Sequence, residues 1–193
     1  MYRKTLSVFF IFLTGVFAFA SLAWNAEIQV ITLHGKPLTL IGKKSELGKS
    51  LPALSLPDLG MEMIDLQSFK GKVTIMSVVP SLDTPTCEKQ THILSEENGG
   101  LDKTVNLVTV SRDLPFAQKR FAKNAKINNI IFLSDYRNAE FGKKTGLLIK
   151  ENFLLARAVF VLDQKGIVRY LEIVSELAKL PDMDKAMDFA RSL

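Results

Sequence analysis

A single cysteine is the residue of this chain best suited to nucleophilic chemistry. Cys87 follows a loop bounded by prolines, within Thr84-Pro85-Thr86-Cys87-Glu88. Thr84 suits a helix N-cap and Pro85 suits the first helical position, so the spacing predicts Cys87 in the first turn of a helix. The free N–H groups and the dipole at a helix N-terminus favour an anion. Because the thiolate is the reactive form of cysteine, this placement predicts a nucleophile.

The alternative interpretation of Cys87 is a buried, inert residue, because free cysteine is among the most buried residue types. Its neighbours Asp83, Thr86 and Glu88 are polar or turn-forming and indicate an exposed loop end. The Thr84 hydroxyl also has two interpretations. It caps the helix, or it hydrogen-bonds the thiolate or a bound substrate oxygen. The two roles are compatible, and the spacing alone favours capping.

An arginine inside an apolar run is the second unusual feature. Arg157 interrupts Phe153-Leu-Leu-Ala-Arg157-Ala-Val-Phe-Val-Leu162. A buried guanidinium is costly unless an anionic group meets it. Its partner is either a carboxylate elsewhere in the fold, or the Cys87 thiolate and the negative charge that develops on a substrate oxygen. Composition leaves both partners open.

Short apolar runs alternate with helical segments along the chain, and these elements must position Cys87 and Arg157. The order predicts a mixed sheet with helices on both faces, which suits a thioredoxin-like α/β sandwich with an N-terminal β-hairpin. The predicted hairpin comprises 28–33 and 38–41, and a connector at 43–58 follows it. The other predicted strands are 73–79, 105–110, 130–133, 158–162 and 167–173, and the predicted helices are 86–97, 115–126, 138–145 and 182–192.

Composition excludes several classes of protein. The 193 residues carry a formal net charge of +5, and 47% of them are apolar, which excludes a disordered chain. One cysteine excludes an internal disulfide and a thiolate metal cage, and two histidines are too few for a His-rich site. The chain has neither a glycine-rich phosphate loop nor a basic stripe with interleaved aromatics. We therefore expect no metal, no cofactor and no nucleic-acid partner.

Residues 1–26 differ in character from the rest of the chain. The basic pair Arg3-Lys4 precedes a long uncharged run that is rich in phenylalanine. A basic start, an apolar run and small residues at alternate positions are typical of a secretory signal peptide. Cleavage after Ala20 or after Ala23 fits this pattern.

An uncleaved membrane anchor is the alternative for this leader. Roughly 20 apolar residues span a bilayer, and residues 5–26 carry no charge. With either interpretation, residues 27–193 form one exported domain. It is periplasmic, or it is anchored to the inner membrane.

The loop before Cys87 resembles a known signature. Pro80-Ser-Leu-Asp83-Thr84-Pro85-Thr86-Cys87 is similar to the Pro-x-x-x-Thr-x-x-Cys signature of the peroxiredoxins. Further blocks resemble the thiol peroxidase branch of that family, in the same order, from about residue 27 to the C-terminus. These blocks are Ser111–Phe121, Asn128–Ser134, Tyr136–Phe141 and Ala156–Asp163.

The resemblance implies an enzyme that reduces hydrogen peroxide and organic hydroperoxides. It implies that Cys87 is the peroxidatic cysteine and that Pro80 shields it. It also implies that Thr84 hydrogen-bonds Cys87 and the peroxide, and that Arg157 stabilises the thiolate and the transition state. Members of this branch usually form homodimers and lie in the cytoplasm, so the leader is atypical.

The resemblance fails at the resolving cysteine. Many members have that cysteine directly after an Arg-Phe pair, but here Ala122 follows Arg120-Phe121. The sulfenic acid formed on Cys87 must therefore be reduced by an external thiol, on a thioredoxin-like or glutaredoxin-like protein or a small molecule. A disulfide between two Cys87 residues across a dimer is the less favoured route.

Two functions of other classes remain open. One is a thiol redox sensor or binding protein, in which oxidation of Cys87 changes the affinity for a partner without peroxidase turnover. The other is a structural thioredoxin-like domain whose cysteine is incidental. A Cys–His protease pair is not expected, because His92 lies five residues after Cys87 and off its helical face.

Overall fold

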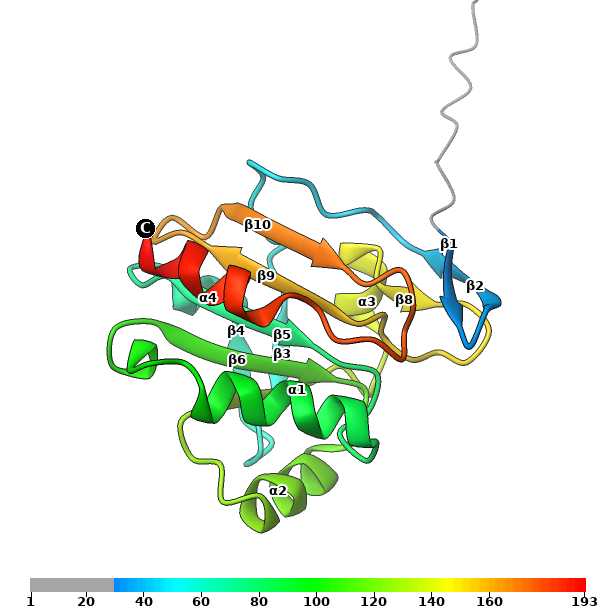
Figure 1. Ribbon diagram of the computed structural model, residues 1–193, viewed down its shortest axis with the longest axis horizontal. Coiled ribbons are helices and arrows are strands. Elements are labelled where there is room, and N and C mark those ends of the chain that lie inside the picture. The colour runs from blue at the N-terminus through cyan, green and yellow to red at the C-terminus, as the bar shows by residue number, and fades with distance from the viewer. Residues whose placement is uncertain (1–29) are drawn as a thin grey trace, which may run out of the picture.

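A five-stranded mixed sheet forms the centre of the domain in the computed structural model, which describes residues 30–193 (Figure 1). Three neighbouring strands run parallel, and β9 pairs antiparallel with both β5 and β10. The predicted mixed sheet is thus confirmed. In spatial order its strands are β10 (Val168–Ile173), β9 (Ala158–Leu162), β5 (Thr74–Val78), β6 (Asn106–Ser111) and β7 (Ile131–Ser134).

Continuous apolar runs form the middle of this sheet because both of its faces are covered. Every residue of β5 and of β9 is buried. A strand that is covered on both faces reads as an unbroken apolar segment rather than an alternating one. This pattern located the central strands in the sequence to within a residue or two.

The helices lie on both faces of the sheet, as predicted (Figure 1). Helices α1 and α4 cover one face, where they contact β5, β6 and β9, and α2 lies against β7 at the edge. Helix α3 belongs to the core of the opposite face, to which it contributes Phe141. The helices are α1 (Pro85–Glu96), α2 (Pro115–Asn124), α3 (Glu140–Thr145) and α4 (Met183–Arg191).

Side chains of the central strands alternate between two apolar cores. Ile75 and Val159 belong to the core under α1 and α4, whereas Met76 and Phe160 belong to the core of the opposite face. Successive residues of a strand point to opposite faces. Arg157 lies two residues before Val159, so it falls on the face that α1 covers.

A β-hairpin begins the described chain. Strands β1 (Val30–Leu33) and β2 (Lys36–Ile41) pair antiparallel, and β2 also pairs with β8 (Leu148–Ile149). The predicted hairpin is confirmed over the described residues. The leader 1–26 and the predicted start of the hairpin lie outside them.

The prediction of a plain connector at 43–58 is wrong at its end. Strand β3 (Ser55–Pro57) forms there and pairs antiparallel with β4 (Met63–Asp65), and a short 3-10 helix (Leu66–Phe69) follows. Strands of two or three residues are too short to show a hydrophobic period, which is why β3, β4 and β8 escape a sequence analysis. A second 3-10 turn, Leu101–Lys103, precedes β6.

The end of the chain forms as the sequence indicates. Asp182 is the N-cap of α4, and its carboxylate accepts a hydrogen bond from the Lys185 N–H at 2.9 Å. Among residues 30–193, no helix is long and apolar enough to cross a bilayer.

Candidate active site

Cys87 lies in the first turn of α1, directly after the loop that leaves β5. Thr84 is the N-cap and Pro85 is the first helical residue, as predicted. The expectation of an exposed position is wrong, because Cys87 is 0% exposed and belongs to the core under α1 and α4. Asp83 and Glu88 are exposed. Neighbouring helical residues point about 100° apart, so polar flanks do not decide which way a cysteine points.

Arg157 meets the sulfur inside the fold. This side chain is 2% exposed, and its Nη2 lies 3.4 Å from the Sγ of Cys87. Its Nε donates to the carbonyl of Leu177 at 2.9 Å, and its Nη1 donates to the Oε1 of Gln90 at 2.8 Å. Between residues 30 and 193, Arg157 forms no ion pair with a carboxylate. Of the two partners that the sequence left open, the sulfur is the group that Arg157 contacts.

The guanidinium places a positive charge beside this sulfur. Its Nη2 lies 3.4 Å from the Sγ inside the fold, where charges are screened less than at the surface. A thiolate in turn supplies the negative charge that a buried guanidinium requires.

Gln90 is a site residue that sequence reasoning missed. It is 0% exposed and lies three residues after Cys87, on the same face of α1. Its Nε2 donates to the Oγ of Ser77 at 2.8 Å, which leaves Oε1 free to accept from Arg157. Gln90 therefore fixes the orientation of the guanidinium. The available signal was a polar residue one helical turn after Cys87, on the face turned to the sheet.

The Thr84 hydroxyl does not cap α1, contrary to the prediction. Its Oγ1 donates to the carbonyl of Ser81 at 3.1 Å, so the hydroxyl closes the loop instead of satisfying a helix N–H. Within the described residues no hydrogen bond joins Thr84 to Cys87. A role for Thr84 in binding peroxide stays a prediction.

Pro80 is buried where the loop leaves β5. The loop that begins near Pro80 leads into α1. Pro80 and Cys87 therefore lie at the two ends of one loop. Whether Pro80 shields the sulfur from water stays a prediction.

Asp113 ties this loop to the neighbouring strand. Its carboxylate accepts hydrogen bonds from the Ser81 hydroxyl at 2.7 Å, the Leu82 N–H at 2.8 Å and the Ser111 hydroxyl at 2.7 Å. Asp113 was not among the site residues predicted from the sequence. The carboxyl ends of β5 and β6 meet at one edge of the sheet, so a polar residue just after β6 was the available signal.

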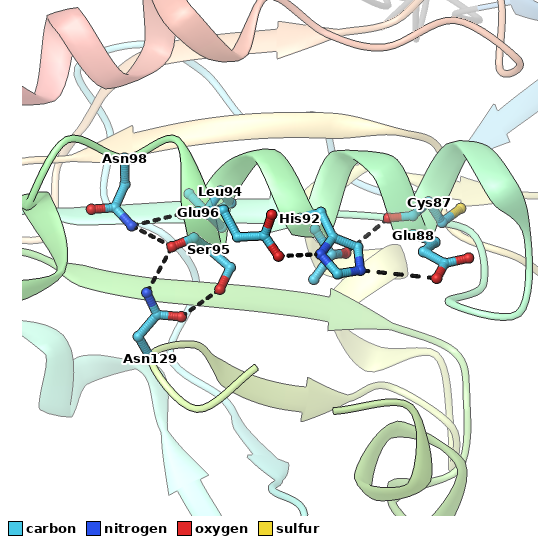
Figure 2. Close-up of polar contacts among 9 residues, drawn as sticks. Cys87, Glu88, His92, Leu94, Ser95, Glu96, Asn98 and Asn129 are labelled. Atoms are coloured by element: carbon cyan, nitrogen blue, oxygen red, sulfur yellow. Dashed lines mark hydrogen bonds and ion pairs between the residues drawn. The ribbon is translucent and has the colours of Figure 1, made fainter. Parts of the chain in front are cut away.

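His92 lies away from the sulfur and is half-buried on α1 (Figure 2). Its Nδ1 lies 2.6 Å from the Oε1 of Glu96, and its Nε2 lies 3.9 Å from the Oε1 of Glu88. Neither ring nitrogen contacts Cys87 in the described part of the chain, in agreement with the sequence analysis.

The position of the missing resolving cysteine lies inside the fold. Ala122 is buried on α2, in the same core as Cys87. Cys87 is the only cysteine in the sequence and is a free thiol. No second thiol of the chain can attack an oxidised Cys87.

Known proteins resemble the chain over most of its length. A family model described as Redoxin matches residues 46–187. The thiol peroxidase of Bacillus subtilis is 44% identical over 163 residues, which cover 84% of this chain and 97% of the relative. The thiol peroxidase of Streptococcus pneumoniae is 43% identical over 164 residues, covering 85% of this chain and 100% of the relative.

Solved structures show the same fold. The crystal structure of a peroxiredoxin-like protein from Aquifex aeolicus aligns with a TM-score of 0.79 at 35% identity, over 84% of this chain and 96% of that one. A thiol peroxidase from Chromobacterium violaceum aligns with a TM-score of 0.73 at 23% identity, over 84% of this chain and 95% of that one. The thioredoxin-like sandwich predicted from the sequence is therefore confirmed.

Proposed function

The chain belongs to the thiol peroxidase branch of the peroxiredoxin family, and we propose that it reduces hydroperoxides with Cys87 as its single redox-active residue. As a member of this branch it is a thiol-dependent peroxidase, and hydrogen peroxide and organic hydroperoxides are its substrates. One observation carries the assignment of the site. The Cys87 Sγ lies 3.4 Å from the guanidinium of Arg157, a buried cation without a carboxylate partner among the described residues.

The first step oxidises the cysteine. The Cys87 thiolate attacks one oxygen of the hydroperoxide, an S–O bond forms and the O–O bond breaks. The electron pair of the O–O bond passes to the departing oxygen, which takes a proton and leaves as water or an alcohol. Cys87 becomes a sulfenic acid. Negative charge grows on the departing oxygen, and fixed donors stabilise it there.

Arg157 is the main donor for that charge. Gln90 and the Leu177 carbonyl hold its guanidinium in place, so no reorientation is needed during the reaction. The Thr84 hydroxyl gives up its hydrogen bond to the Ser81 carbonyl and donates to a peroxide oxygen instead. Pro80 keeps water from the sulfur.

Access to the sulfur requires movement at the start of α1. Cys87 exposes none of its surface, whereas Asp83, Thr84 and Pro85 just before it are exposed. A shift of these residues admits a hydroperoxide, and a larger opening of the first turn admits a thiol. The Thr91 hydroxyl opposes this opening, since it donates to the Cys87 carbonyl at 2.8 Å.

An external thiol returns the enzyme to its starting state. The thiol attacks the sulfenic sulfur, water leaves, and a mixed disulfide with Cys87 forms. A second reductant thiol attacks the mixed disulfide. Cys87 leaves as a thiolate, and the two reductant sulfurs form a disulfide with each other. The reductant is a thioredoxin-like or glutaredoxin-like protein or a small thiol. Without a resolving cysteine, the sulfenic acid persists longer and is more prone to irreversible oxidation.

Export of the domain is also part of the proposal. The leader 1–26 supports a periplasmic location after cleavage, or attachment to the inner membrane if residues 5–26 stay in place. The reductant must then be present outside the cytoplasm. The homodimer usual in this branch is proposed here as well.

Turnover tests the function. We expect the reduced protein to consume many equivalents of hydrogen peroxide when thioredoxin and its reductase regenerate it, or when a small thiol does. Consumption of one equivalent with every reductant tried would instead identify a redox sensor. The Cys87→Ser variant is the control and is expected to consume no peroxide.

A further inference from the structure

A cleft lined by lysines lies apart from the proposed active site. Its volume is about 450 Å³, and none of Cys87, Gln90 or Arg157 lines it. Four lysines contribute to its wall, and Glu46 is the single carboxylate among the residues that line it. These lysines are Lys43, Lys44, Lys49 and Lys144.

Backbone contacts hold one side of the cleft against the end of α3. The Lys43 N–H donates to the carbonyl of Lys143 at 2.7 Å, and the Ser45 N–H donates to the carbonyl of Thr145 at 3.0 Å. Gly42 permits this close approach, because a Cβ at that position would collide with the Lys143 backbone. The backbone that carries Lys43 is thereby held beside the helix that carries Lys144.

The other side of the cleft is held against the edge strand β10. The Gly48 N–H donates to the carbonyl of Val168 at 2.8 Å, and the Val168 N–H donates to the carbonyl of Lys49 at 2.9 Å. Figure 1 shows this connector running from β2 back alongside β10. The backbone that carries Lys49 is therefore as well anchored as the backbone that carries Lys43.

The positive charge of the cleft is largely uncompensated. Lys144 pairs with Glu140 at 3.1 Å, but within residues 30–193 no ion pair includes Lys43, Lys44 or Lys49. Lys43, Lys44 and Lys49 are exposed, so their long side chains reach a bound anion from several directions. An anion with two or more negative charges accepts hydrogen bonds from several such ammonium groups.

We propose that this lysine cleft binds a phosphate group, as a free diphosphate or phosphate ester or on a lipid headgroup. A phosphate offers several oxygens to ammonium groups that approach from different directions, which one carboxylate does not. The volume leaves room for the rest of a phosphorylated molecule, and Ser45 and Ser50 are further polar residues that line the cleft. The site is independent of the chemistry at Cys87.

Calorimetric titration of the full chain with inorganic pyrophosphate tests the site. We expect saturable binding that weakens as sodium chloride is raised, and a loss of affinity of about tenfold or more in Lys43→Gln/Lys49→Gln. The control is Lys119→Gln/Lys123→Gln, which removes the same charge from exposed positions of α2. Equal affinities for the wild type and the cleft variant, or equal losses in both variants, would overturn the proposal.

Sedimentation with vesicles distinguishes the two sources of phosphate. Retention on phosphatidylglycerol but not phosphatidylcholine vesicles, lost in the cleft variant and reversed by pyrophosphate, assigns the site to a lipid headgroup. Pyrophosphate binding without such retention assigns it to a soluble phosphate. Absence of both kinds of binding refutes the site. Unchanged thermal unfolding and unchanged alkylation of Cys87 establish that the cleft variant is folded.

Discussion

The pairing of Cys87 with Arg157 depends on a third side chain. Gln90 accepts from the Arg157 Nη1 at 2.8 Å and donates to the Oγ of Ser77 at 2.8 Å. It thus links the guanidinium to a central strand. Arg157 has a fixed direction in this arrangement, which a flexible cation beside a sulfur would lack.

Replacing Gln90 tests this positioning. We expect Gln90→Leu to slow the reaction of Cys87 with hydrogen peroxide by about tenfold and to lower stability by ~1–3 kcal/mol, because it leaves a buried donor of Arg157 unpaired. Gln90→Glu keeps an acceptor for the guanidinium but adds a negative charge that competes with the sulfur for Arg157, so it should also react slowly while losing less stability than Gln90→Leu. Stopped-flow fluorescence and denaturant unfolding give the two quantities. If Gln90→Leu reacted as fast as the wild type, Gln90 would not be what positions Arg157.

Residue type and spacing singled out Cys87 and Arg157 but not the residues that hold them in place. Cys87 and Arg157 stand out because a lone cysteine at a helix start and an arginine in an apolar run are each unusual. Gln90 and Asp113 are ordinary polar residues, and their roles arise only when the fold directs them at the site. The burial of Cys87 also escaped prediction, since it depends on the rotation of α1 about its axis.

At the scale of elements, the site is a junction between two strand–helix units. The β5–α1 loop carries Pro80 and Thr84, and the β6–α2 loop carries Asp113. The Asp113 carboxylate joins the two loops through Ser81 and Leu82. The start of α1 therefore depends on the neighbouring unit for its position.

Weakening the hydrogen bonds of the Asp113 carboxylate should expose the start of α1. We expect Asp113→Asn to accelerate hydrogen–deuterium exchange at the Leu82 amide, because an amide is a weaker acceptor than a carboxylate and supplies only one acceptor oxygen. Asp83→Asn is the matched control, since the Asp83 carboxylate accepts no hydrogen bond among the described residues. Exchange mass spectrometry on loop peptides measures the effect. Equal exchange in the two variants would show that the Asp113 carboxylate does not hold this loop in place.

The elements themselves were largely readable from the sequence. Continuous apolar runs gave β5 and β9, and cap residues gave the starts of α1 and α4. The short strands β3, β4 and β8 carry no periodic signal, so only tertiary pairing reveals them.

Across the whole molecule, the N-terminal hairpin reaches the site through one segment. The Thr32 N–H donates to the carbonyl of Ser175, and the Leu177 N–H donates to the carbonyl of Thr32, both at 2.7 Å. The carbonyl of Leu177 in turn accepts from Arg157 at 2.9 Å. The hairpin thus secures the backbone that holds the guanidinium.

Glu176 adds an acid-sensitive contact to this attachment. Its carboxylate accepts from the Thr32 hydroxyl at 2.8 Å and from the His34 N–H at 3.0 Å, and these bonds lower the pKa of Glu176 to about 2. Because the folded pKa lies below the ordinary value of 4.5, the contribution to stability is complete above pH 4.5. It is lost as the pH falls toward about 2.

A pH series of thermal unfolding checks this attachment. We expect Glu176→Gln to lower the melting temperature at neutral pH, because the amide is a weaker acceptor for the hairpin. The difference from the wild type should shrink as the pH falls from 4.5 toward about 2. Glu97→Gln, at an exposed position, should show no such trend. A difference that stays constant over this range would contradict the assignment to Glu176.

The rate at which peroxide oxidises Cys87 in Arg157→Ala tests the central claim most directly. Loss of one oriented donor in such a site typically costs ~10²–10³ in rate, and we expect a loss of that size in a folded protein. Stopped-flow mixing with hydrogen peroxide measures the rate, mass spectrometry identifies the sulfenic acid, and circular dichroism verifies the fold. A rate equal to that of the wild type, with the fold intact, would contradict the account.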